Sequence, residues 1–166
     1  MLFQLSEEHV MIQKAARDFA QNECLPGAIE RDEKQKFPYD QVMKLAELGF
    51  LGMMVEPKYG GAGMDTISYV LAMEEISKID ASVSVVMSVN NSLVCYGLEA
   101  YGTEEQKQKL LPRLATGEEI PCFALTEPGA GSDAGSITSE GVLFKGTDGK
   151  LYVRLNWNKR WITLAA

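Results

Sequence analysis

The sequence predicts an α+β protein that is mainly α. A helical segment over residues 1–117 precedes the start of an antiparallel β segment over residues 118–166. Up to Gly117, apolar residues recur at helical spacing between capping residues and glycines. After Gly117, short runs rich in β-branched and aromatic residues alternate with turn-forming residues. The few predicted strands would leave an open sheet edge, so we expect a truncated or incomplete second domain.

The first predicted helix spans residues 6–24. Ser6 is a candidate N-cap, and two glutamates follow it at the positive end of the helix dipole. Pro26 and Gly27 end the helix. Its inward face is expected to consist of Ile12, Ala15, Ala16, Phe19 and Ala20.

Two more helices flank a glycine-rich loop at residues 57–63. The first begins after Pro38, ends at Gly49 and places Val42, Leu45 and Leu48 inward. The second covers Thr66–Ile79, and its buried stripe is expected to be Val70, Met73, Ile76 and Ile79.

Residues 82–101 fit either a strand or a helix. The stretch from Ser82 to Val89 alternates and is β-branched, and Asn90 with Asn91 could form a turn. As a helix the segment would be apolar nearly all round, and therefore central to a bundle. The pattern alone does not decide between the two.

The last helix and the strands follow. Thr103 and Gln106 form a capping box that opens a helix ending at Gly117, with Leu110, Leu111 and Leu114 on its apolar face. The predicted strands are Ile120–Thr126, Val142–Phe144, Lys150–Leu155 and Arg160–Thr163, with a hairpin turn at residues 147–149.

Composition excludes several classes of function. The formal charge of −7 over 166 residues argues against a nucleic-acid or anionic-membrane surface, because phosphates are bound by clustered Lys and Arg. No stretch approaches the ~20 apolar residues of a membrane span, and the N-terminus resembles neither a signal sequence nor a transit peptide. We therefore expect a soluble, cytosolic protein.

The nucleophile and metal-ligand content is low. Cys24, Cys95 and Cys122 are far apart without a CxxC pair, which is typical of free, mostly buried thiols in a reducing compartment. His9 is the single histidine, and we expect it to be solvated on a surface helix. No zinc site and no catalytic triad is predicted.

A glycine-rich loop carries the main candidate for ligand binding. The glycines from Gly129 to Gly135 do not have the spacing of the dinucleotide fingerprint. Hydroxyls at Thr126 and Ser132 flank the loop, so a phosphate-bearing ligand is physically sensible, although spacing alone favours an ordinary Pro-Gly turn. Trp157 and Trp161 fit either core packing, which is favoured, or a platform for a planar ligand.

The loop Leu125–Asp133 (LTEPGAGSD) resembles the flavin-loop signature of the acyl-CoA dehydrogenase family. Four further segments occur in that family's order: Pro57–Gly63 (PKYGGAG), Met87–Leu93 (MSVNNSL), Tyr101–Lys107 (YGTEEQK) and Lys159–Thr163 (KRWIT). Met87–Leu93 is most similar to short-chain, butyryl-type members, and Arg154–Ala165 to the large bacterial long-chain branch.

The resemblance implies a fold and a set of flavin contacts. An N-terminal helical bundle would be followed by an incomplete antiparallel β-barrel domain, and residues 82–101 would be helical. The residues implied to bind FAD are Phe123, Ala124, Leu125, Thr126, Gly131, Ser132, Trp161, Ile162 and Thr163. Trp161 would cover one face of the flavin. The Thr126 hydroxyl would face the side of the ring with the reactive nitrogen, and Thr163 would hydrogen-bond the ring edge.

The resemblance also implies a reaction. Family members oxidise a fatty acyl-CoA at its α and β carbons and pass a hydride to FAD. Ser132 would lie near the CoA end of the substrate, and Val89 and Leu93 would border its acyl chain. The family's glutamate base belongs to a segment after residue 166, so no catalytic residue is assigned in this chain. An isolated chain of this length is therefore expected to be inactive alone.

The implied partners are acyl-CoA, an electron-transfer flavoprotein as acceptor, and further copies of the chain, since the family forms tetramers. The implied location is the bacterial cytoplasm, or the mitochondrial matrix in a eukaryote. Two alternatives stay open: a non-catalytic helical fragment that binds a partner, and a flavin monooxygenase of the same architecture. Three departures from the family pattern are Trp157 for a usual Gly, Leu164 for a usual Asn, and Phe123 for a usual Tyr.

Overall fold

The computed structural model describes residues 4–164 and divides into two compact units. The helical unit ends at Pro121, and the C-terminal unit begins at Cys122. The predicted domains, 1–117 and 118–166, divide the chain at a nearby point. Residues 1–3 and 165–166 of those domains lie outside the described residues, as does Ala165 of the segment that resembles the long-chain branch.

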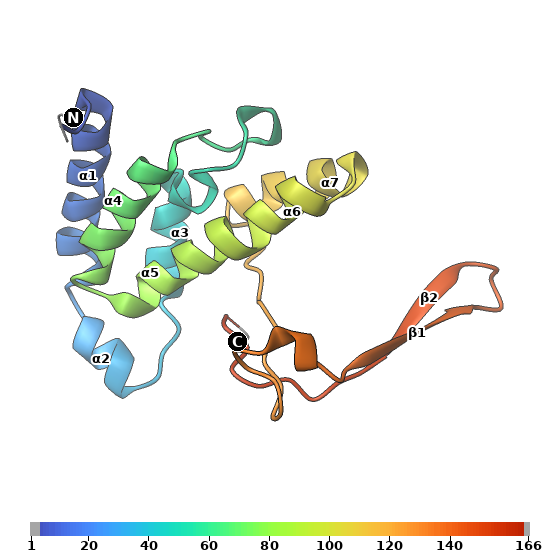
Figure 1. The fold of residues 1–166 in the computed structure, drawn as a ribbon. Coiled ribbons are helices and arrows are strands. Elements are labelled where there is room, and N and C mark those ends of the chain that lie inside the picture. Colours follow the sequence, from blue (N-terminus) through green and yellow to red (C-terminus); the bar gives the residue numbers. More distant parts are fainter. Residues whose placement is uncertain (1–3, 165–166) are drawn as a thin grey trace. The chain divides into compact units, whose positions relative to one another are not determined.

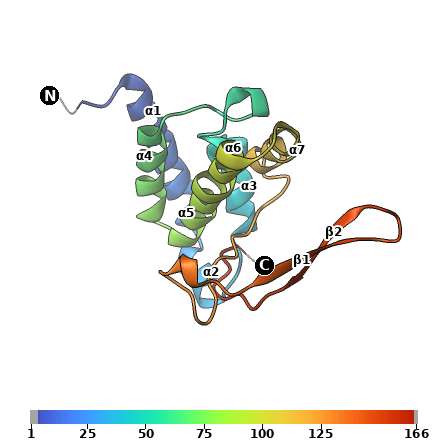
Figure 2. The same cartoon turned by 45° about the vertical axis from the view of Figure 1, so that its right-hand side comes forward.

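The helical unit contains seven α-helices in its described residues (Figures 1 and 2). Their bounds are α1 Glu7–Phe19, α2 Ala28–Glu33, α3 Tyr39–Glu47, α4 Thr66–Ser77, α5 Ala81–Ser88, α6 Tyr96–Tyr101 and α7 Glu104–Ala115. Helices α1 and α4 lie side by side, and α4 in turn packs on α5. Short helix α2 was not predicted from the sequence.

Helix α1 begins and packs largely as its sequence predicts. The Ser6 hydroxyl accepts a hydrogen bond from the His9 amide, and the backbone continues as a π-helix over Ala20–Cys24. Ile12, Ala16, Phe19 and Ala20 are buried. Ala15 is exposed, contrary to the prediction, because it lies on the flank of the stripe that faces α4.

The inward faces of α3 and α4 differ from the prediction: Leu48 and Val70 are exposed, and Met73 and Ile79 are only partly buried. Val42 and Leu45 are buried, but Leu48 is half exposed at the end of α3. In α4, the buried residues are Ser68, Ala72, Glu75 and Ile76, while Val70 is 53% exposed. Since α4 packs on both α1 and α5, its buried face turns towards that pair and leaves Val70 outside.

Residues 82–101 are helical, so the resemblance was right and the strand interpretation was wrong. Helix α5 runs through a π-helix at Val89–Cys95 into α6. Two buried amides hold the π-helix: Asn90 Nδ2 donates to the carbonyl oxygens of Leu51 (2.6 Å) and Leu114 (3.1 Å), and Asn91 Nδ2 to that of Phe50 (2.8 Å). Burial on several sides overrides the β-propensity of the valines.

This helical run also corrects one expectation. Ala81–Tyr101, 21 residues long, is long and apolar enough to cross a membrane by length and composition alone. Within its most apolar window, 44% of the residues are buried inside the structure. The buried asparagines bond to neighbouring loops and helices, as in the core helix of a folded unit.

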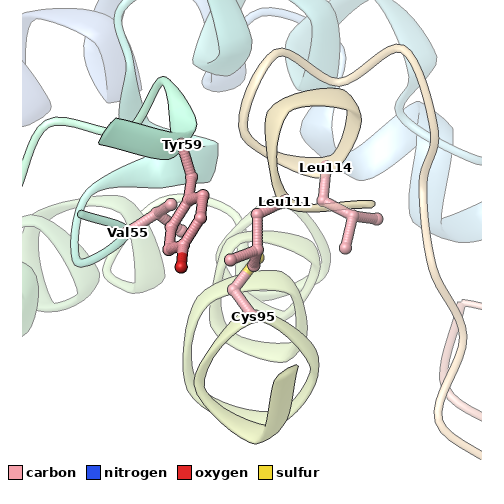
Figure 3. Packing of buried hydrophobic residues seen from close by; sticks show 5 residues of the cluster. All are labelled: Val55, Tyr59, Cys95, Leu111 and Leu114. Carbon is pink, nitrogen blue, oxygen red and sulfur yellow. The ribbon is translucent and has the colours of Figure 1, made fainter. Parts of the chain in front are cut away.

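One cluster of the helical core connects α7 to the glycine-rich loop at residues 57–63. Thr103 and Gln106 form the predicted capping box. Val55, Tyr59, Cys95, Leu111 and Leu114 pack into one cluster (Figure 3). A Cβ at Gly61 would lie 2.1 Å from the Val55 carbonyl oxygen, so only glycine lets the loop approach this cluster.

The C-terminal unit contains one two-stranded antiparallel sheet in its described residues. Strands β1 (Glu140–Lys145) and β2 (Leu151–Asn156) pair around the predicted turn, where Gly149 has φ +78°. All twelve strand positions are exposed, and the sheet is not closed. The predicted strands Ile120–Thr126 and Arg160–Thr163 are not strands. They share one isolated bridge, between Phe123 and Thr163.

Two of the three cysteines are buried as predicted, whereas the histidine is not solvated as predicted. Cys24 and Cys95 are buried free thiols, and burial raises the pKa of each to about 12, whereas Cys122 is exposed. His9 is not solvated: its side chain is 15% exposed, and Nε2 lies 2.9 Å from an Asp65 carboxylate oxygen.

Candidate functional site

Two segments that are distant in sequence meet in the C-terminal unit. The Phe123 amide donates to the Thr163 carbonyl oxygen at 3.2 Å, and the Arg160 amide donates to the Thr126 carbonyl oxygen at 2.8 Å. The second bond joins Thr126 to the residue next to Trp161. The structure therefore brings together the two segments that the resemblance assigns to one flavin.

A buried carboxylate holds the loop in place. Glu127 accepts hydrogen bonds from Lys159 Nζ at 2.8 Å, from the Thr138 amide at 2.9 Å and from the Ser139 hydroxyl. The Glu127 and Lys159 side chains are 5% and 6% exposed. Lys159, followed by Ser139 and Thr138, lowers the pKa of Glu127 to about 2. The carboxylate is therefore ionised at any pH near neutrality.

The loop itself is a tight turn with an open backbone. Glu127 and Ala130 exchange two backbone hydrogen bonds, of 2.9 and 3.2 Å. At both Gly129 and Gly131, an added Cβ would meet no atom within 4 Å, and neither residue has a positive φ. Nothing in the described chain requires glycine here, whereas a ligand approaching the amides closely would.

Trp161 is presented outward. It is 84% exposed and adopts φ +54°, a left-handed conformation that costs a non-glycine residue about 1–2 kcal/mol. The sequence alone favoured core packing for Trp161 and Trp157; this is wrong within the described unit, because Trp157 is also exposed, at 54%. An exposed indole in an unfavourable backbone conformation is typical of a site where a ligand repays the strain.

The predicted site residues fall into two groups. Partly buried in the C-terminal unit are Phe123, Ala124, Thr126, Ile162 and Thr163. Exposed there are Leu125, Gly131, Ser132 and Trp161. In the helical unit, Val89 is buried at 5% exposure and Leu93 is 42% exposed, so Leu93 has the more accessible side chain.

Sequence reasoning missed the Glu127–Lys159 pair, because nothing in a 32-residue separation predicts a contact. The family departures also separate in the structure. Trp157 does not have a positive φ, so it causes no strain where glycine is usual. Leu164 does, at φ +68°, a conformation that Asn tolerates better than Leu. Beside the loop, Glu127, Gly129, Thr138 and Trp157 border an open depression of about 400 Å³.

Comparison with known proteins places this geometry in a family. Residues 6–118 match the family described as acyl-CoA dehydrogenase, N-terminal domain. The mitochondrial short-chain specific acyl-CoA dehydrogenase of Bos taurus is 44% identical over 162 residues, which are 98% of this chain and 38% of the relative.

Two solved structures extend the comparison. One, described as the electron transferring flavoprotein of Acidaminococcus fermentans, has a TM-score of 0.89 and 39% identity over 98% of this chain and 41% of that one. Another, an acyl-CoA dehydrogenase complexed with FAD from Bacillus anthracis, has a TM-score of 0.85 and 37% identity over 96% and 27%. This chain thus spans about two fifths or less of these relatives. Its closer similarity to the long-chain branch near the C-terminus stays a prediction. The helical fold and the match over residues 6–118 establish that the chain belongs to the acyl-CoA dehydrogenase family.

Proposed function

We propose that this chain forms the helical domain and the flavin-contacting loop of an FAD-dependent acyl-CoA dehydrogenase. The observation that carries the proposal is the backbone pairing of two segments. We call residues 123–133 the Thr126 loop and residues 159–163 the Trp161 segment; the hydrogen bonds Phe123–Thr163 and Arg160–Thr126 join them. That pairing places a hydroxyl, two open glycine amides and an exposed indole within one small unit. These are the group types that a planar ring with a phosphate-bearing tail requires.

The residues present fit FAD. Trp161 offers an exposed planar surface, and the Thr126 and Thr163 hydroxyls lie in the two paired segments. Open space around Gly129 and Gly131 allows a phosphate to approach the backbone. We assign ring contacts to the stretch from Phe123 to Thr126 and to Trp161–Thr163, and pyrophosphate contacts to Gly131 and Ser132.

When bound, FAD supplies the acceptor for the hydride that leaves the β carbon of an acyl thioester. The residues of this chain hold and orient the ring, and Ser132 contributes a hydroxyl towards the CoA end of the substrate. The proton on the α carbon requires a base, and we assign none to residues 1–166. Positioning of this kind accounts for much of the rate enhancement in cofactor enzymes.

The names of the relatives support a proposal for the substrate and the partners. The Bos taurus relative is named for short-chain substrates, and we propose a short acyl-CoA, with Leu93 along its acyl chain. The Acidaminococcus fermentans structure is described as an electron transferring flavoprotein, and we propose such a flavoprotein as electron acceptor. Assembly into a tetramer, and a bacterial cytoplasmic or mitochondrial matrix location, complete the proposal.

Titration of the 166-residue chain with FAD tests this function. We expect flavin fluorescence to show weak, saturable binding, and anaerobic acyl-CoA to cause no turnover by this chain alone. Thr126→Ala should weaken FAD binding about fivefold, as expected for the loss of one hydrogen bond of ~1 kcal/mol. Thr147→Ala, in the exposed hairpin turn, is the matched control. Absence of any FAD binding, together with capture of a protein partner by the helical unit, would favour the non-catalytic alternative.

A further inference from the structure

We propose that Glu127 and Lys159 are positioning residues for the flavin: their ion pair locks the Thr126 loop to the Trp161 segment. This inference rests on the proposed function and adds to it two residues that the flavin contacts leave out. The lock fixes where the indole stands relative to the Thr126 hydroxyl.

The lysine bridges the two segments directly. Its Nζ donates to the Leu125 carbonyl oxygen at 3.0 Å and to Glu127 Oε1 at 2.8 Å, so it grips the residues on either side of Thr126. Lys159 itself lies two residues before Trp161. The Lys159 side chain thus connects the Trp161 segment, to which it belongs, to the residues on both sides of Thr126.

The glutamate adds a third segment to the lock. Its second carboxylate oxygen accepts from the Thr138 amide and hydroxyl, at 2.9 and 3.1 Å, and Ser139 also donates to the carboxylate. These residues immediately precede β1. Three stretches of chain therefore converge on one ionised side chain, whose pKa of about 2 keeps it charged.

Polar contacts define this site, because the unit has almost no apolar core. Among residues 122–164, Ala130 is the only apolar residue that is buried. The other ion pair of this unit, between Lys150 and Asp148, is exposed and spans 3.9 Å. Removing one partner of a buried pair leaves an uncompensated charge, so each single variant should disturb the site electrostatically as well as structurally.

Removing the charge of Glu127 and removing the charge of Lys159 should shift the reduction potential of the flavin in opposite directions. Glu127→Gln leaves the lysine cation, which stabilises an electron-rich reduced flavin and raises its reduction potential. Lys159→Met leaves the carboxylate at pH 8 and lowers the potential. A role limited to holding the fold would shift both variants in the same direction.

The experiment uses the 166-residue chain with FAD and compares Glu127→Gln and Lys159→Met with the exposed controls Glu140→Gln and Lys150→Met. We expect each lock variant to weaken FAD binding at least tenfold, each control to stay within twofold, and Lys159→Arg to recover most of the affinity. At saturating FAD, the potentials of the lock variants should shift in opposite directions. Far-UV circular dichroism verifies that the helical unit is folded in every variant.

A second measurement needs no flavin. In a Trp157→Phe background, Trp161 is the single tryptophan, and its fluorescence anisotropy should fall in both lock variants and not in the controls. If wild-type chain binds no FAD while anisotropy falls as expected, the lock stands and the flavin function fails. Where the wild-type chain does bind FAD, the inference is overturned if the lock variants bind FAD as tightly as wild type, or if both potentials shift the same way. It is also overturned if the anisotropy of Trp161 is unchanged in both lock variants.

Discussion

The helical unit and the C-terminal unit treat apolar residues in opposite ways. In the helical unit, Leu45, Ile76 and Leu111 are completely buried. In the C-terminal unit, Leu143, Leu151 and Trp161 are 67%, 67% and 84% exposed. Hydrophobic packing holds the first unit together, whereas the second depends on hydrogen bonds and on the buried ion pair between Glu127 and Lys159.

The contrast explains where the candidate site lies. A lone two-stranded hairpin is marginally stable in water, so its side chains are free to face a ligand or other chain segments. A close-packed helical core, in contrast, tolerates little change in shape. We infer that the helical unit supplies stability and the C-terminal unit supplies binding groups.

The largest expected effect comes from replacing a leucine by alanine in each of the two units. Leu111→Ala should lower the free energy of unfolding by about 2–5 kcal/mol, because it opens a cavity in the cluster of Figure 3. Leu143→Ala, on the exposed hairpin, should change it by less than ~0.5 kcal/mol. Urea denaturation followed at 222 nm measures both. Equal losses would show that the hairpin is also packed in solution.

Replacing an asparagine should likewise lower the free energy of unfolding in the helical unit and leave it almost unchanged in the C-terminal unit. Asn91→Ala removes the hydrogen bonds that the buried Asn91 amide donates to the carbonyl oxygens of Phe50 and Met87, at a cost of about 1–3 kcal/mol. Asn158→Ala, at an exposed position of the C-terminal unit, should cost almost nothing. Urea midpoints again compare the pair, and a neutral Asn91→Ala would show that the Asn91 amide does not help to hold the π-helix.

The acid response of the helical unit should depend on Glu75. The Arg17 guanidinium, 2.9 Å away, lowers the pKa of Glu75 to about 2. Because this pKa is depressed, its stabilisation is present above the unfolded value of about 4.3 and is lost as pH falls towards 2. Because Arg17 is half exposed, solvent screens the ion pair. We therefore expect Glu75→Gln to reduce the acid-induced loss of unfolding free energy by only about 1 kcal/mol.

Urea midpoints measured from pH 7 down to pH 2 test this dependence. At pH values below 4.5, the urea concentration at the midpoint should decrease for wild type, and it should decrease less steeply for Glu75→Gln. Glu30→Gln, whose side chain is 66% exposed, is the matched control and should follow wild type. Identical slopes in all three proteins would contradict the assignment.

The smallest effect concerns backbone strain beside the site. Leu164→Asn should relieve the left-handed conformation at φ +68° and stabilise the local fold by about 0.5–1 kcal/mol. The Phe123 amide, which bonds to Thr163, should then exchange its hydrogen about two- to fivefold more slowly. Leu155→Asn, in ordinary strand backbone, should give no such protection, and faster exchange in Leu164→Asn would refute the strain argument.

Local features of the fold were predictable because local chemistry determines them. Ser6 and Thr103 cap their helices as expected, and the hairpin turn lies where Gly149 allows it. The faces of α3 and α4 were predicted less well, since Leu48 and Val70 are apolar at helical spacing and yet exposed. Which stripe is buried depends on the helices that pack against it, and spacing carries no information about those neighbours.

The candidate site divides in the same way. The sequence by itself indicated the family, which the comparisons confirm, and predicted the flavin loop and its residues, because these lie in short continuous motifs. Tertiary structure alone decided that Trp161 faces outward and that Glu127 meets Lys159. For residues 82–101, the local pattern left strand and helix open, and only the family resemblance implied the helix that the structure shows. The physical reason is that burial and ion pairing depend on contacts between segments far apart in the chain, whereas capping and turn formation need only near neighbours.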